Sequence, residues 1–141
     1  MGRVSARRPV APDLFELHAD GSLTLLGGYS PSSGRHHFPR FAICPYTGAD
    51  DVEAAPLADR ARLWLWTAVT AAPPGYTGPV PFGFGVVELP EGLRLVTRIT
   101  EADPAALTLG MPMRLVADVV ATDDDGTEVV AWAFTPQGDA A

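Results

Sequence analysis

Apolar and polar residues alternate in short runs along this chain, a pattern that predicts β-strands rather than helices. Two N-terminal runs, residues 13–17 and 22–26, flank Asp20-Gly21, a dipeptide typical of tight hairpin turns. Fourteen glycines and fourteen prolines interrupt the chain too often for long helices. Five longer runs follow toward the C-terminus, over residues 62–69, 82–89, 93–100, 113–120 and 128–134. The pattern therefore predicts a mainly β protein that begins with a hairpin.

The five C-terminal runs have the order of an OB-type barrel. Between the third and the fourth, Asp103-Pro104 favours one capped helical turn over residues 103–107. Five strands with a helical insertion at that point are typical of the OB-fold. We therefore expect four segments, which are a flexible tail at 1–12, a hairpin with a loop-rich module at 13–51, a five-stranded OB-fold barrel at 60–136 and a flexible tail at 137–141.

Composition restricts the cellular compartment and the classes of binding partner that we expect. The 141 residues are 47% hydrophobic and 19% charged, as in a folded chain. The single cysteine, Cys44, fits a reducing compartment, and no apolar run approaches the ~20 residues that would span a membrane, so we expect a cytoplasmic protein without a membrane partner. Net charge is −7, and the ten basic residues are all scattered arginines, so we expect no nucleic-acid partner. The absence of lysine together with abundant Ala, Gly and Pro is typical of a GC-rich bacterial genome.

Three segments of the predicted barrel carry a family likeness, residues 82–89, 91–98 and 109–115. They resemble the zinc-ribbon and OB-fold accessory proteins of the DUF35 type, which run as a hairpin, a rubredoxin-like ribbon and an OB barrel. The likeness extends over roughly Leu14 to Phe134. It implies a thiolase-like partner (a ketothiolase, an acyltransferase or a retro-aldolase) that acts on acyl-CoA or related acyl substrates. In such complexes the partner carries the nucleophile, and the small subunit completes the assembly and helps to shape the substrate cavity.

The ribbon is where this sequence departs from the family. The resemblance places the four zinc-ligand positions, two C-x2-C pairs in the family, on Ser30, Ser33, Cys44 and Thr47. Only one of these is a thiol, and hydroxyls are poor zinc ligands because they stay protonated near neutral pH. We therefore expect no metal and no other cofactor. A site rebuilt from Cys44 with His36 or His37 is less favoured, because adjacent residues of an extended segment point to opposite sides.

A ribbon without zinc needs another source of stability. We expect an aromatic core formed by Tyr29, Phe38, Phe41, Ile43 and Tyr46.

No catalytic constellation stands out in the sequence. Nucleophilic catalysis needs a nucleophile with a base within hydrogen-bond reach. Cys44 near His36-His37 is the nearest such combination, and a decayed metal ligand explains Cys44 better. Asp123–Asp125 precede a glycine and predict a solvated turn. We therefore expect a chain that has no catalytic residues of its own.

Partner binding is the expected role, as an accessory subunit present in two copies on a dimeric enzyme. The hypothesised contact surface consists of Tyr76, Phe82, Phe84 and Trp66, with the ribbon around Phe38–Pro45 as a second candidate. In Leu63–Trp66, either both tryptophans fill the barrel or one pair of side chains faces the partner. Gly83 and Gly85 either let another chain or ligand approach or permit a tight bend of the barrel.

Two rival functions stay open. A stand-alone acyl-CoA or lipid-binding protein predicts a pocket between barrel and ribbon, with arginines near the CoA phosphates. These arginines would be drawn from Arg35, Arg40, Arg94 and Arg98. A single-stranded nucleic-acid binder would instead use exposed aromatic residues of the barrel, and the missing lysines count against it.

Overall fold

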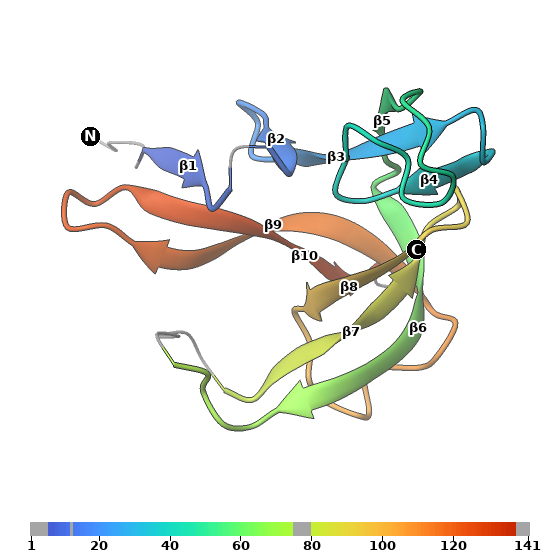
Figure 1. Ribbon diagram of the computed structural model, residues 1–141. Helices are drawn as coiled ribbons and strands as arrows, with labels where there is room; N and C mark the ends of the chain where they lie inside the picture. Colours follow the sequence, from blue (N-terminus) through green and yellow to red (C-terminus); the bar gives the residue numbers. More distant parts are fainter. Residues whose placement is uncertain (1–5, 12, 75–79, 138–141) are drawn as a thin grey trace.

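The chain folds into two β-sheets (Figure 1). This computed structural model describes residues 6–11, 13–74 and 80–137. No helix occurs within these described ranges, which confirms the predicted mainly β class. The strands are β1 (Arg7–Pro9), β2 (Phe15–Leu17), β3 (Leu23–Ser30), β4 (Arg35–His37), β5 (Glu53–Pro56), β6 (Arg60–Val69), β7 (Phe82–Glu88), β8 (Arg94–Ile99), β9 (Pro112–Thr122) and β10 (Glu128–Pro136).

β3 is the central strand of the N-terminal sheet. Its first half pairs with β2, and the turn between them contains Gly21 at a φ of 89°, as the Asp20-Gly21 signal predicts. Its second half pairs with β4 on one side and with β5 on the other. No sequence pattern predicts β5, which carries this sheet as far as Pro56.

The second sheet closes into a five-stranded barrel in the order β6-β7-β8-β10-β9, with β9 returning to β6. Between β8 and β10 the pairing is parallel and joins Ile99 to Phe134. This closed barrel confirms the predicted OB-fold. The predicted helical turn is only a hydrogen-bonded turn, in which Ala106 N–H donates to the Asp103 carbonyl at 2.9 Å. Asp103 still caps it, because its carboxylate accepts the Ala105 N–H at 2.9 Å.

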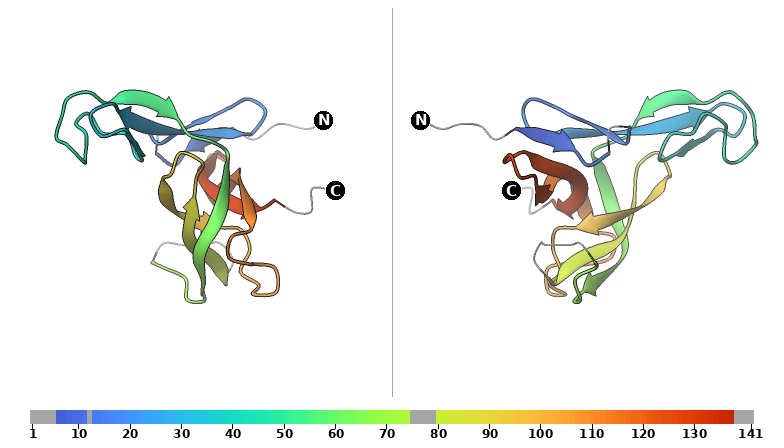
Figure 2. Two further views of the ribbon diagram at one scale, coloured as in Figure 1. Left: turned by 90° about the vertical axis from the view of Figure 1, so that its right-hand side faces the viewer. Right: turned by 60° about the vertical axis from the view of Figure 1, so that its left-hand side comes forward.

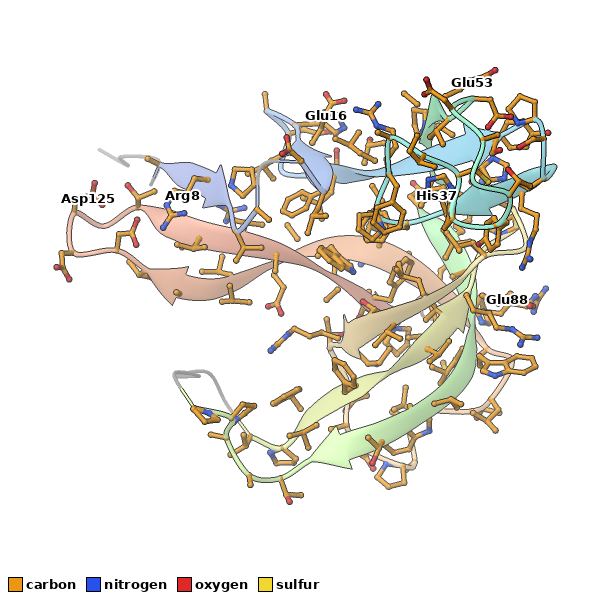
Figure 3. All side chains as sticks on the ribbon, in the orientation of Figure 1. Arg8, Glu16, His37, Glu53, Glu88 and Asp125 are labelled. Carbon is orange, nitrogen blue, oxygen red and sulfur yellow. The ribbon has the colours of Figure 1, made fainter. Side chains whose placement is uncertain are left out.

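β1 lies within the segment predicted to be a flexible tail. It pairs in parallel with β10 and lies beside the outer part of the β9–β10 hairpin (Figure 1). Ion pairs flank it, Arg7 to Glu128 at 2.8 Å and Arg8 to Asp123 at 3.0 Å. Figure 3 labels Asp125 at the outer end of this hairpin and Arg8 on the neighbouring β1. A three-residue strand that depends on a partner far along the sequence has no local pattern of its own, and this is why the tail prediction is wrong for Arg7–Pro9.

One hydrophobic core joins the two sheets. The N-terminal sheet lies across one end of the barrel (Figure 2). Phe15 and Leu25 of this sheet are buried in the same cluster as Phe134 of the barrel. At the junction, the Trp132 ring meets the rings of Phe15 and Phe38 edge-on, with centroid distances of 6.0 and 5.4 Å. Edge-to-face contacts are a favoured arrangement of aromatic pairs, so Trp132 fixes the hairpin module on the barrel.

A β-bulge in β6 decides which side chains of that strand face outward. Leu63 is opposite Val87 and Leu65 is opposite Val86, so Trp64 is an extra residue between them. As a result Leu63 is buried, while Trp64 and the following Leu65 are both exposed. Neither predicted arrangement of this run is correct, because both assumed strict alternation.

Candidate functional site

Two turns of the ribbon have the same backbone geometry. We call them the knuckles, Ser30–Gly34 and Cys44–Gly48. In the first, Gly34 N–H donates to the carbonyl of Ser30 at 2.8 Å, and in the second Gly48 N–H donates to the carbonyl of Cys44 at 2.9 Å. Each ends in a glycine of positive φ, 67° at Gly34 and 76° at Gly48. The two residue pairs predicted as zinc-ligand positions thus occupy equivalent places.

Polar side chains connect the two knuckles. The Ser30 hydroxyl donates to Asp51 Oδ1 at 2.7 Å, and Ser32 N–H donates to Asp51 Oδ2 at 2.7 Å. The Ser32 hydroxyl contacts the hydroxyls of Ser30 at 2.9 Å and of Thr47 at 2.7 Å. These bonds, the one from the Ser30 hydroxyl above all, hold the pKa of Asp51 below its ordinary value of 3.8. The carboxylate is therefore the ionised centre of a network that spans both turns.

Cys44 lies against this network and is 2% exposed. Its sulfur accepts the N–H of Tyr46 at 3.4 Å. Burial raises the pKa of the thiol, but the neighbouring Ser30 and Thr47 hydroxyls and the N–H groups of Tyr46 and Thr47 outweigh it and lower the pKa to about 6. Among the hydrogen bonds of the described residues, none joins Cys44 to a histidine, and the buried sulfur is closed to a substrate, so the geometry does not support a nucleophilic role for this thiol.

The two adjacent histidines face different surroundings. The His36 ring lies 4.9 Å from the ring of Tyr29. His37 is buried, stacks on Phe41 at 5.7 Å, and accepts the N–H of Phe41 at Nε2 over 3.2 Å. Burial, and then the neighbouring charge of His36, lowers the pKa of His37 from 6.5. Within the part of the chain that the structure describes, no three His, Cys, Asp or Glu side chains gather as a metal site.

The donors at the four predicted ligand positions do not fit zinc. The set consists of one thiol and three hydroxyls. Two of these hydroxyls, those of Ser30 and Thr47, form hydrogen bonds with other side chains. The third, Ser33, donates to the carbonyl of Ser30 at 3.1 Å. Zinc in structural sites takes thiolate or imidazole ligands, which this set lacks apart from Cys44.

The predicted aromatic core of the ribbon is wrong. Phe41, Ile43 and Tyr46 are 49%, 48% and 42% exposed, although Phe38 is packed against the barrel core. The guanidinium of Arg35 covers the Tyr46 ring from outside at 4.1 Å. Polar contacts at the knuckles take the place that the aromatic residues were expected to fill.

The four candidate arginines do not converge. Arg35 and Arg94 line one pocket of about 590 Å³ between ribbon and barrel, together with Glu88 and Glu91. Figure 3 labels Glu88 on this side of the molecule. The Arg94 guanidinium lies 3.7 Å above the Trp64 ring and 3.4 Å from the Glu88 carboxylate. Two further candidates lie elsewhere: Arg98 pairs with Asp118 of β9 at 2.8 Å, and Arg40 is exposed on the ribbon.

A second, apolar pocket of about 660 Å³ opens between β7 and the β9–β10 hairpin. Phe82 and Phe84 line it, with Arg98 beside them and the Arg98 guanidinium 4.8 Å from the Phe82 ring. The candidate Trp66 is half-buried against the barrel core instead. Tyr76 lies outside the described residues.

The glycine pair of β7 belongs to the barrel wall. A Cβ at Gly85 would collide with the carbonyl oxygen of Leu65, and one at Gly83 with that of Glu101. Both glycines are buried, so the space beside them is filled by the backbone of this chain and not left open to another chain or a ligand.

Sequence reasoning missed an exposed apolar row on the barrel. Leu65, Val86 and Val96 are opposite one another on β6, β7 and β8. Leu65 and Val96 are 49% and 57% exposed, Val86 between them is half-buried, and Phe84 beside Val86 on β7 is 39% exposed. The sequence did indicate that Val96 faces outward, because it lies two positions from both Arg94 and Arg98 and so shares their face of the strand. For Leu65 the sequence gives no such indication, because the bulge at Trp64 shifts the alternation of side chains in β6.

No helix long and apolar enough to cross a membrane was found among the described residues.

Comparisons with known proteins agree with the barrel. Residues 54–118 match the family model of the ChsH2 C-terminal OB-fold domain. The chain is 29% identical over 87% of its length to the benzoylsuccinyl-CoA thiolase subunit BbsA of Thauera aromatica, and covers 84% of it. It is 25% identical over 92% of its length to a DUF35 domain-containing scaffold protein of Pyrococcus furiosus, and covers 95% of it.

Among solved structures, the fold is similar to a chain of the Ltp2-ChsH2(DUF35) aldolase, with a TM-score of 0.60 and 24% identity. The match covers 80% of this chain and 84% of that one. At this identity the likeness concerns the fold alone. The barrel is thus similar to the OB-fold domain of the ChsH2 type, and the chain as a whole is similar to DUF35-type scaffold proteins and to a thiolase subunit.

Proposed function

We propose that this chain is a non-catalytic accessory subunit of a thiolase-like enzyme, a ketothiolase, acyltransferase or retro-aldolase, that acts on acyl-CoA or related acyl substrates. The observation that carries the proposal is the exposed apolar row of Leu65, Val86 and Val96 on a chain related to a thiolase subunit. Apolar side chains that cluster on a surface mark interaction sites far more often than single exposed ones do.

The proposed contact surface extends from this row in two directions. On the barrel it continues to Phe84 and the apolar pocket beside β7. Toward the ribbon it passes Trp64 and Arg94, then crosses the pocket that Tyr46 also lines. Aromatic and arginine side chains of this kind are enriched at interfaces and often dominate binding energy.

The burial of Cys44, and the lack of a hydrogen bond between it and a histidine among the described residues, support a non-catalytic role. The thiol has hydroxyl and backbone N–H neighbours, and the buried His37 uses its Nε2 to accept the N–H of Phe41. The partner would supply the catalytic residues. A symmetric dimeric partner would bind two copies of this chain.

The test is affinity capture with the tagged full chain from a lysate of its own cells, followed by mass spectrometry. A thiolase-like protein recovered in stoichiometric amount is expected, with a complex mass by light scattering that gives two copies per partner dimer. Leu65→Glu and Val96→Glu should abolish capture, whereas Thr122→Glu, an exposed change at the outer end of β9, should not. Equal capture by wild type and the two row variants would refute the surface. Recovery of the chain alone would refute the function.

A stand-alone acyl-CoA-binding function is the second candidate, favoured by the pocket that holds Arg35 and Arg94. Isothermal titration with an acyl-CoA and without partner tests it. Binding that the double variant Arg35→Ala/Arg94→Ala weakens at least tenfold would support this function. No binding by the wild type would rule it out.

A further inference from the structure

We propose that a hydrogen-bond network centred on Asp51 joins the two knuckles in place of a zinc ion, and that the ribbon therefore folds without metal. In a zinc ribbon the metal is the link between two such turns. Here the turns keep matching geometry, each closed by a bond from a terminal glycine to the carbonyl of the first residue. The link that the metal would provide must come from side chains.

Asp51 supplies that link from outside both knuckles. One carboxylate oxygen accepts the Ser30 hydroxyl and the other accepts Ser32 N–H, each at 2.7 Å. Ser32 then reaches the second knuckle, where its hydroxyl contacts that of Thr47 at 2.7 Å. Bonds to an ionised carboxylate are shorter and about twice as strong as neutral ones. A continuous path thus runs from Asp51 through Ser30 and Ser32 to Thr47.

The hydrogen-bond network and a zinc ion would compete for the same hydroxyl groups, those of Ser30 and Thr47. A serine or threonine oxygen that keeps its proton is a poor replacement for a thiolate at zinc, and the Ser30 hydroxyl uses its proton in the bond to Asp51. Ser30 is buried, so water cannot take over the bond between its hydroxyl and Asp51, whereas Ser32 and Thr47 at the other bonds are exposed. A buried polar group whose bonds are all made within the protein stabilises one arrangement of the chain.

Aromatic side chains add a second, partly exposed set of contacts to this link. Phe41, Ile43 and Tyr46 are about half exposed, and Tyr46 of the second knuckle meets the His37 ring edge-on and donates its hydroxyl to the His36 carbonyl at 3.2 Å. Phe38 is packed against Trp132 of the barrel, so it anchors the ribbon without joining the knuckles.

The experiment compares Asp51→Ala with Asp50→Ala, a neighbouring exposed carboxylate, in the full chain. Amide hydrogen exchange is followed by NMR at Ser32, Gly34 and Gly48, with barrel amides such as Val87 as internal reference. In Asp51→Ala the knuckle amides should exchange at least tenfold faster while barrel amides are unchanged, and Asp50→Ala should match the wild type. Ser32→Ala, a milder change, keeps the test open if Asp51→Ala does not fold.

Metal measurements complete the test. Wild-type protein purified with zinc should contain none by mass spectrometry and should show the same exchange after EDTA. Adding Ser30→Cys, Ser33→Cys and Thr47→Cys to Asp51→Ala should create a site for one zinc ion, and zinc should restore slow exchange at the knuckles. Stoichiometric zinc in the wild type, unchanged exchange in both Asp51→Ala and Ser32→Ala, or a cysteine variant that zinc does not protect would each overturn the proposal.

Discussion

The glycine pair of β7 offers a sharp test of how the barrel is built. Gly85→Ala adds one methyl group at a position where a Cβ would collide with the Leu65 carbonyl oxygen and lie 2.8 Å from the Cα of Trp66. Both obstacles are backbone atoms of the neighbouring strand, so no side-chain rotation can relieve the overlap. Gly85 has no positive φ, so the whole cost is steric.

The size of the effect follows from two opposing contributions. Inserting a methyl group into a closely packed site costs about 1–3 kcal/mol, and rigid backbone neighbours place this case near 3 kcal/mol. Replacing glycine restricts the unfolded chain, which returns about 1 kcal/mol. The free energy of unfolding should therefore fall by about 2 kcal/mol. At about 2–4 °C per kcal/mol for a chain of this size, the melting temperature should fall by roughly 4–8 °C.

Urea and thermal unfolding followed by circular dichroism measure this change. Val96→Ala on the adjacent strand is the control, because that side chain is exposed and its truncation should alter stability by less than about 0.5 kcal/mol. Equal stability of Gly85→Ala and wild type would refute the steric argument. A stable Gly85→Ala variant that no longer captures the partner would mean that the glycine serves the interface instead.

Two further predictions concern the ribbon and its junction with the barrel. Because burial, and then the charge of His36, lowers the pKa of folded His37 below its ordinary 6.5, the unfolded chain binds a proton there that the folded chain does not. Stability should consequently fall as the pH drops below about 6.5, and urea unfolding at pH 7 and 5.5 should show a smaller difference for His37→Gln than for wild type. Trp132→Ala removes the ring that joins Phe15 and Phe38, so it should cost about 3 kcal/mol in urea unfolding, whereas Trp64→Ala on the exposed face should cost much less.

Local sequence predicts some features of the ribbon and leaves others open. The knuckle glycines, Gly34 and Gly48, follow the predicted ligand pairs directly and mark the turns. Asp51, by contrast, is indistinguishable from Asp50 in the sequence. Only the folded chain brings it within hydrogen-bond distance of Ser30, 21 positions earlier. An aromatic core was the natural expectation for a ribbon without zinc, and the structure replaces it with polar contacts.

The sequence by itself determined where most strands and tight turns lie, since side-chain alternation and turn residues act within a few positions. It also determined that three of the four expected thiols are missing. Tertiary structure decided which side chains face outward on β6, where one extra residue at Trp64 shifts the alternation, and whether Arg7–Pro9 pair with a strand. It also decided which arginines share a pocket. These outcomes depend on partners distant in the chain, and a local pattern holds no information about such partners.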